Sequence, residues 1–191
     1  MGIDPKANVM LVFGGIKENE KKLINKAFNF IPVKNKVLLA PKLKVNKRKI
    51  GYIRLREWVW RLEKWILKWN KSRRIDLGFI KEEDAHYYLN AADFLLIPRT
   101  TELNSGNITL GCTFGLVVVG KDTGDIGEIL KETGNPTFTV GDDQSLKEAI
   151  EKAYHLKKNQ HGIKNKKLAI EEWGVETIAK AYIEEMILVN E

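Results

Sequence analysis

The first residues that could form part of a ligand site are two glycines that follow an apolar, strand-like run at 9–13. Gly14 and Gly15 have no side chains, so the backbone at this turn can approach a ligand closely. Lys17 and Lys21 come soon after and could face the charge of a phosphate. Two adjacent glycines also suit any tight turn between a strand and a helix, so this motif alone leaves a purely structural role open.

A richer candidate is the segment from Pro98 to Asn107, which follows the apolar run 94–97. Pro98 ends the strand, and Ser105, Gly106 and Asn107 then begin a helix rich in small residues. A helix start of this kind offers free backbone N–H groups and the positive end of the helix dipole, which together hold phosphate groups. We therefore expect this helix start to bind a diphosphate.

Acidic residues mark two further candidates. Glu102 lies just before the helix start, and its carboxylate would accept hydrogen bonds from sugar hydroxyls, unless it is simply an exposed loop acid. The turn from Gly124 to Glu128 follows a later strand, and its alternative is an ordinary acid at a helix N-terminus. The sequence shows no Ser/His/Asp or Cys/His set and no metal-ligand spacing, so we expect no metal site.

These motifs occur in a chain whose short β-rich runs alternate with helical patterns, which is typical of βαβ units. The predicted strands cover 9–13, 37–39, 75–79, 94–97, 116–119 and 137–140, and the predicted helices cover 18–30, 50–71, 82–91, 106–114, 125–132, 144–158 and 163–188. We therefore predict an α/β fold, a Rossmann-like, doubly wound sheet of six parallel strands with helices on both faces. Ligands of such sheets bind beyond the carboxyl ends of the strands, where the glycines and Glu102 fall.

The composition indicates one soluble globular domain over residues 1–191. The chain is 43% hydrophobic and 30% charged, which allows a sizeable core beneath a solvated surface. Cys112 is the single cysteine, so no disulfide can form within the chain, and a reducing compartment is expected. The sequence contains neither an apolar run of about 18 residues nor a signal-peptide pattern, so we expect a cytoplasmic location.

The charge of the chain is unevenly divided. Residues 1–80 hold 20 Lys and Arg against 6 Asp and Glu, whereas residues 81–191 hold 12 against 19. A basic half of this kind implies an anionic partner, either nucleic acid, a phospholipid surface or the phosphates of a nucleotide.

In the predicted helix 50–71, the residues Ile53, Trp60 and Leu67 form a second apolar strip among basic residues. This strip would be buried by its own domain or would contact another domain or an anionic membrane.

The motifs resemble, in order and spacing, the C-terminal half of retaining GT-B glycosyltransferases that build capsules, lipopolysaccharide and exopolysaccharide. The resembling segments are 2–5, 9–13, 77–80, 89–94 with Pro98, 104–115, 117–119, 124–128 and 173–187, so the resemblance spans nearly the whole chain. It implies that residues 1–191 form a nucleotide-sugar donor-binding domain, the second half of a GT-B fold. The N-terminal domain that binds the acceptor in such enzymes would be absent from this chain.

The resemblance also implies roles for individual residues. Glu102 would hold the sugar, and the other implied contacts are Ser105, Gly106 and Asn107 to the phosphates, Gly14 and Gly15 along the diphosphate, and Phe79 and Ile80 in the base pocket. The family commonly has a second glutamate where this chain has Leu110, an arginine at Gly15 and a lysine at Glu20. Charge compensation for the phosphates is therefore expected from Lys17, Lys21 or Arg99.

The sequence thus favours a hexosyl-type glycosyltransferase donor domain that acts in cell-surface polysaccharide synthesis. Its expected partners are a nucleotide diphosphate sugar as donor, a separate acceptor-binding domain and an anionic membrane surface, with no cofactor and a cytoplasmic or peripheral membrane location. The isolated half would be inactive without the acceptor domain. The alternatives are a nucleotide-sugar epimerase of the same fold and a non-catalytic module that binds anions or membranes. Nucleic acid is not expected, because no known nucleic-acid-binding pattern accompanies the basic charge.

Overall fold

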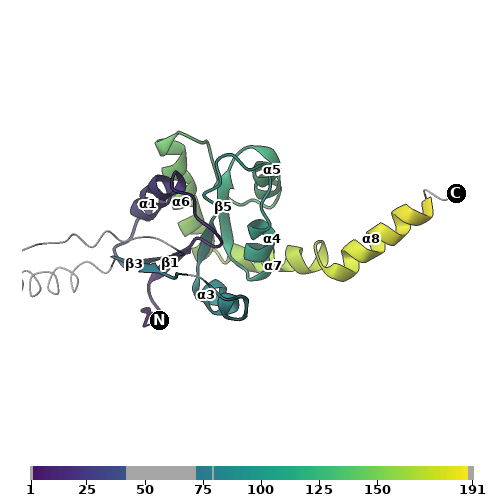
Figure 1. Ribbon diagram of the computed structural model, residues 1–191, viewed down its shortest axis with the longest axis horizontal. Helices are drawn as coiled ribbons and strands as arrows, with labels where there is room; N and C mark the ends of the chain where they lie inside the picture. The colour runs from purple at the N-terminus through teal and green to yellow at the C-terminus, as the bar shows by residue number, and fades with distance from the viewer. Residues whose placement is uncertain (1, 42–71, 79, 189–191) are drawn as a thin grey trace, which may run out of the picture.

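The computed structural model describes residues 2–41, 72–78 and 80–188. Its centre is a sheet of six parallel strands in the order β3-β2-β1-β4-β5-β6 (Figure 1). The strands are β1 (Asn8–Leu11), β2 (Lys36–Ala40), β3 (Ser72–Asp76), β4 (Phe94–Leu96), β5 (Val117–Lys121) and β6 (Thr137–Phe138). The strand order reverses between β1 and β4, so the helices that follow these two strands, α1 (Glu20–Phe30) and α4 (Asn107–Thr113), lie on opposite faces of the sheet and leave between them the crevice in which doubly wound folds bind ligands. The predicted fold class is confirmed.

Helices cover both faces of the sheet (Figure 1). They are α1 (Glu20–Phe30), α3 (Ala85–Ala91), α4 (Asn107–Thr113), α5 (Gly124–Glu132), α6 (Asp143–Lys158), α7 (His161–Glu171) and α8 (Val175–Leu188), with a 3-10 turn, η1 (Glu82–Asp84), before α3. On one face, α1 and α6 pack on the strands through Phe28 and Ile150. On the other face, α3 packs through Leu89, and α4, α5 and α7 share a second cluster.

The central strands are mostly apolar because both of their faces are buried. In β1, the side chains of Val9 and Leu11 enter the core beneath α3, whereas Met10 enters the core beneath α1 and α6. All three are at most 3% exposed. Successive side chains of a strand point to opposite faces, so an unbroken apolar run is what a strand covered on both sides requires.

The edge strand β3 differs from its prediction. The sequence predicts a strand at 75–79, but β3 runs over Ser72–Asp76 and pairs only with β2. Its residues Arg73 and Arg74 are exposed, so the apolar pattern that marks the inner strands is missing. Gly78, with φ +62°, turns the chain away after the strand, and the carboxylate of Asp76 accepts a hydrogen bond from its N–H at 2.9 Å.

The last predicted helix, 163–188, is in fact two helices. α7 ends at Glu171 and α8 begins at Val175, with Gly174 in the break. Gly174 lacks a side chain where a Cβ would lie 2.6 Å from the carbonyl oxygen of Ile170, so this close passage of the chain requires glycine. α8 then extends away from the body of the domain (Figure 1).

Two predictions fall outside the described residues. These are the helix at 50–71 with its strip of Ile53, Trp60 and Leu67, and the base-pocket residue Phe79. Smaller differences affect the helix predicted at 82–91, which begins as the 3-10 turn η1, and the strand predicted at 137–140, of which only Thr137–Phe138 pairs with β5. Among the described residues, no helix is long and apolar enough to span a bilayer.

Candidate functional site

The turn after β1 and the loop after β4 meet at the carboxyl edge of the sheet. The side-chain amide of Asn107 donates a hydrogen bond to the carbonyl oxygen of Phe13 at 3.0 Å, joining the two segments directly. Gly14 adopts φ +87°, and a Cβ on it would lie 4.0 Å from both the Asn107 amide nitrogen and Nη2 of Arg99. The predicted adjacency of the glycine turn and the start of α4 is therefore confirmed.

Arg99 provides a second link between the same two segments. Its Nη1 donates to both carboxylate oxygens of Glu20, at 2.8 and 3.0 Å, and its Nη2 donates to the carbonyl oxygen of Gly15 at 2.7 Å. Glu20, at the start of α1, is only 1% exposed, and its carboxylate also accepts a hydrogen bond from the backbone N–H of Lys17 at 2.8 Å. One buried carboxylate thus fixes both the first turn of α1 and the guanidinium of Arg99.

Glu102 lies three residues after Arg99 in the same loop and forms an ion pair with Lys17 of the turn after β1. The hydroxyl of Thr101 donates to the other carboxylate oxygen at 3.0 Å. The hydrogen bond from Lys17, followed by one from backbone N–H, lowers the pKa of Glu102 to about 2. The carboxylate is consequently ionised at neutral pH and acts as a hydrogen-bond acceptor.

Of the other residues predicted to bind phosphates, Ser105 and Gly106 lie beside the glycine turn, whereas Lys21 forms its ion pair elsewhere. Ser105 and Gly106 precede α4, where the hydroxyl of Ser105 accepts a long hydrogen bond, 3.4 Å, from the N–H of Asn107. Lys21, on α1, forms an ion pair with Glu18, which lies just before the helix, and within the described residues no hydrogen bond or ion pair joins its side chain to the glycine turn.

Ile80 follows the end of β3, two strands away from β1. Neighbouring strands lie about 4.8 Å apart, which places this strand end about 10 Å from the glycine turn. Ile80 therefore lies at the predicted edge of the sheet but outside the direct contacts of the two loops.

The third predicted turn, at 124–128, supports the loop that carries Glu102. Gly124 adopts φ +65°, and a Cβ on it would lie 3.0 Å from the carbonyl oxygen of Leu103. That same carbonyl accepts a hydrogen bond from the N–H of Ile126 at 3.1 Å. Glu128 is exposed on α5, as expected for an ordinary helix acid. The glycines of this turn therefore have a packing role.

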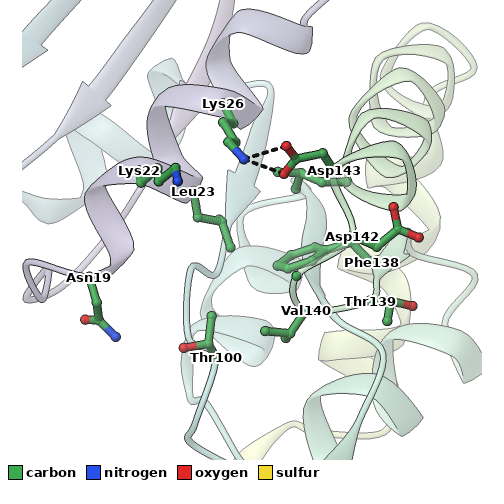
Figure 2. A pocket seen from close by; sticks show the side chains of 12 residues that line it. Asn19, Lys22, Leu23, Lys26, Thr100, Phe138, Thr139, Val140, Asp142 and Asp143 are labelled. Carbon is green, nitrogen blue, oxygen red and sulfur yellow. Dashed lines mark hydrogen bonds and ion pairs between the residues drawn. The ribbon is translucent and has the colours of Figure 1, made fainter.

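A cavity of about 290 Å³ lies beside the two loops, on the face covered by α1 and α6. Figure 2 shows its apolar floor at Leu23, Phe138 and Val140, with the ion pair between Lys26 and Asp143 above it. Its lining residues are Asn19, Lys22, Leu23, Lys26, Thr100, Phe138, Thr139, Val140, Gly141, Asp142, Asp143 and Leu146. Asn19 and Thr100 are the chain neighbours of Glu20 and Arg99, so the cavity adjoins the crevice.

Neither the cavity nor the buried pair of Glu20 and Arg99 is predicted from the sequence. From the sequence, Glu20 is noted only as a departure from a family pattern, although an acid in the first turn of a helix is favoured by the helix dipole and could have drawn attention to it. In the part of the chain that the structure describes, no group of three or more His, Cys, Asp or Glu side chains could hold a metal ion.

In comparisons by sequence, no family model and no curated protein matches the chain. Solved structures do match. HepE from Anabaena, solved with UDP, gives a TM-score of 0.62 at 19% identity, over 94% of this chain and 48% of that one. WaaG, a glycosyltransferase of lipopolysaccharide biosynthesis, gives 0.62 at 18% identity, over 94% and 47%. Sucrose-phosphate synthase from Thermosynechococcus elongatus gives 0.61 at 14% identity, over 98% and 47%.

The fold is that of a GT-B glycosyltransferase domain. The chain spans about half the length of these structures, which agrees with the resemblance to one half of a GT-B enzyme. At 14 to 19% identity the match concerns the fold, so the arguments about the site rest on the residues described above.

Proposed function

We propose that this chain is the donor-binding domain of a glycosyltransferase that takes a nucleotide diphosphate sugar. The observation that carries the proposal is the meeting of the Gly14–Gly15 turn with the loop from Arg99 to Asn107 at the reversal of strand order. This is the crevice in which doubly wound sheets bind nucleotides. Backbone N–H groups, a guanidinium and an ionised carboxylate converge on it, and they match the polar groups of a sugar diphosphate.

The solved structures of similar fold support the choice of ligand. Anabaena HepE was solved with UDP, with UDP-glucose and with UDP and glucose. WaaG is described as a glycosyltransferase of lipopolysaccharide biosynthesis. We accordingly propose a hexosyl donor and a role in cell-surface polysaccharide synthesis, with a glycan or a lipid-linked sugar as the acceptor.

In the proposed reaction, the bond between the anomeric carbon and the diphosphate oxygen breaks, and a bond to an acceptor hydroxyl oxygen forms as the proton of that hydroxyl passes to the departing diphosphate oxygen. Negative charge develops on the departing diphosphate. Arg99, the amide of Asn107 and the exposed N–H groups of the glycine turn would stabilise this charge by directed hydrogen bonds, without a metal ion. Glu102, ionised at neutral pH, would accept hydrogen bonds from the sugar hydroxyls and orient the donor.

The base of the donor, the acceptor domain and the membrane would each contact a different part of this chain. The base would lie toward the end of β3, beside Ile80. A second GT-B domain would bring the acceptor, so this half alone would bind donor without transferring sugar.

The strip of Trp60 and Leu67 would attach the enzyme to the cytoplasmic face of an anionic membrane. Co-sedimentation of Trp60→Ala and Leu67→Ala variants with acidic and neutral vesicles would test this attachment.

Calorimetric titration tests the central proposal. The 191-residue chain is titrated with UDP, GDP and ADP, with the matching nucleosides and with a short DNA duplex at two salt concentrations. We expect one nucleoside diphosphate to bind at least ten times more tightly than its nucleoside. Binding of the duplex alone, with a steep dependence on salt, would instead identify a nucleic-acid-binding module.

A further inference from the structure

In the part of the chain that the structure describes, Glu20 is the one buried acidic residue, and it lies beside the proposed donor site. Its carboxylate is 1% exposed and its oxygens accept hydrogen bonds from Arg99 and from the N–H of Lys17. Arg99 remains 19% exposed at the crevice. A buried carboxylate is costly unless it is fully hydrogen-bonded, and here the two donors, Arg99 and Lys17, come from different segments of the chain.

The same arginine controls the conformation of the glycine turn. Nη2 of Arg99 donates to the carbonyl oxygen of Gly15 at 2.7 Å, which holds that oxygen toward the guanidinium. The peptide bonds are trans, so the N–H of Ile16 points the opposite way. Within the described residues, the N–H groups of Gly14, Gly15 and Ile16 donate to no protein acceptor. The Gly15 carbonyl is thus paired with the guanidinium, and the turn has three backbone donors that no described protein group uses.

We propose that Glu20 is a positioning residue for the diphosphate of the donor. It fixes the guanidinium of Arg99, which in turn binds the diphosphate and orients the Gly14–Gly15 turn. Arg99 thus brings a cation to this site from the loop after β4, whereas position 15 is a glycine and provides none. This inference rests on the proposed function and adds to it how the site obtains its charge and its geometry.

The sign of one mutational effect separates positioning from simple electrostatics. Glu20 is negative, so its replacement by glutamine removes a like charge from the neighbourhood of an anion. If charge alone mattered, Glu20→Gln would tighten binding of a nucleoside diphosphate. If Glu20 acts through Arg99, the same change frees the guanidinium and the turn, and binding weakens despite the more favourable charge.

The experiment measures the affinity of the 191-residue chain for UDP, GDP and ADP and for their nucleosides by calorimetry. For the tightest diphosphate we expect Glu20→Gln to weaken binding about ten-fold, the scale of one hydrogen bond to a charged group. The nucleoside should bind as before. In an Arg99→Gln background the Glu20→Gln change should cause no further loss, because the residue through which it acts is gone. Glu171→Gln, which removes an equal charge on α7, is the matched control.

A second variant keeps the inference testable if Glu20→Gln does not fold, as judged by thermal unfolding. Arg99→Lys keeps the positive charge, but one ammonium cannot bridge the Glu20 carboxylate and the Gly15 carbonyl as a planar guanidinium does, so a similar loss is expected. Diphosphate binding that is unchanged or tighter in Glu20→Gln, or unchanged in Arg99→Lys, overturns this inference and leaves the proposed function standing. Failure of the unmodified chain to prefer any diphosphate over its nucleoside overturns both.

Discussion

Lys17 and Glu102 form an ion pair across the mouth of the crevice, one from the turn after β1 and the other from the loop after β4. The sequence predicts a phosphate contact for Lys17 and a sugar contact for Glu102, so the ion pair joins two side chains that a bound donor would separate. Both side chains remain accessible, at 58% and 31% exposure. An incoming donor can therefore exchange this contact for its own without opening the core.

Replacement of Lys17 by methionine should raise the pKa of Glu102 from about 2 toward the ordinary value of 4.5. The hydrogen bond from Lys17 is the main cause of the lowered pKa, so its loss removes most of the shift. Carboxyl chemical shifts of labelled glutamate, followed by NMR between pH 2 and 6, measure the change. Lys34→Met, at a residue outside this contact, is the control. A Glu102 that still titrates near pH 2 in Lys17→Met would contradict the assignment.

The ion pair between Lys17 and Glu102 should make the free energy of unfolding decrease as the pH falls into the acid range. The pKa of Glu102 is lower in the folded chain than in the unfolded chain, so its contribution to stability is present above about pH 4.5 and is lost as the pH falls toward 2. Because the pair is exposed to solvent, its contribution at neutral pH is small. Lys17→Met should consequently flatten the acid side of a denaturation profile while leaving the midpoint at pH 7 nearly unchanged.

Removal of the Asn107 amide should uncouple the two loops. Asn107→Ala loses the hydrogen bond to the Phe13 carbonyl, and the expected cost is about 1 kcal/mol of the free energy of unfolding. Binding of a nucleoside diphosphate should weaken more than the binding of its nucleoside, because the phosphate contacts depend on the spacing of the loops. Urea denaturation and calorimetry measure the two effects. Asn104→Ala, in the same loop at an exposed position, should leave both unchanged.

Gly106 offers a test of the start of α4. It has φ −59° and no atom within 4 Å of a Cβ built on it, so a valine can be accommodated without a clash. Gly106→Val should leave the unfolding midpoint within a few degrees of the original and weaken diphosphate binding, since the branched side chain shields the adjacent N–H groups. Thr109→Val, on an exposed turn of the same helix, is the control. Unaltered affinity would remove this helix start from the donor site.

The fold was predictable because its inner strands are visible in the sequence as unbroken apolar runs. The runs at Val9–Phe13 and Phe94–Ile97 are apolar throughout, and only a strand buried on both faces needs such a run in a charged chain. The edge strand β3 carries Arg73 and Arg74 instead, so its position was wrong by three residues. The break between α7 and α8 depends on one glycine and a local close contact, which periodicity does not reveal.

The site was predictable where its motifs are local. The glycine turn and the segment up to Asn107 are each contiguous, and the rule for doubly wound sheets brings them together. Glu20 and Arg99 are separated by 79 residues, and each is held in place by hydrogen bonds with the other. A sequence read alone offers two ordinary surface charges at these positions, and the fold turns them into one buried pair.

Cys112 can report on the integrity of the domain. It is fully buried on α4, and burial raises the pKa of its thiol to about 12. The thiolate is the reactive form, so the native chain should react with a thiol reagent at pH 8 only through opening of the structure. Because Cys112 is the only cysteine, labelling rates in increasing urea measure that opening directly. Rapid labelling of the native chain at the rate of a free thiol would contradict the burial of α4.

The docking of α7 depends on a contact between two glycines. A Cβ on Gly162 would lie 1.8 Å from the carbonyl oxygen of Gly115, so the helix backbone passes closer to the turn after α4 than any other residue allows. Gly162→Ala gains about 1 kcal/mol in helix propensity, but it forces α7 away from α4, and overpacking of this kind costs about 1–3 kcal/mol or more. We expect a net loss in urea denaturation, whereas Lys167→Ala, on the exposed side of α7, should have little effect. A stabilised Gly162→Ala variant would show that α7 does not pack on this turn.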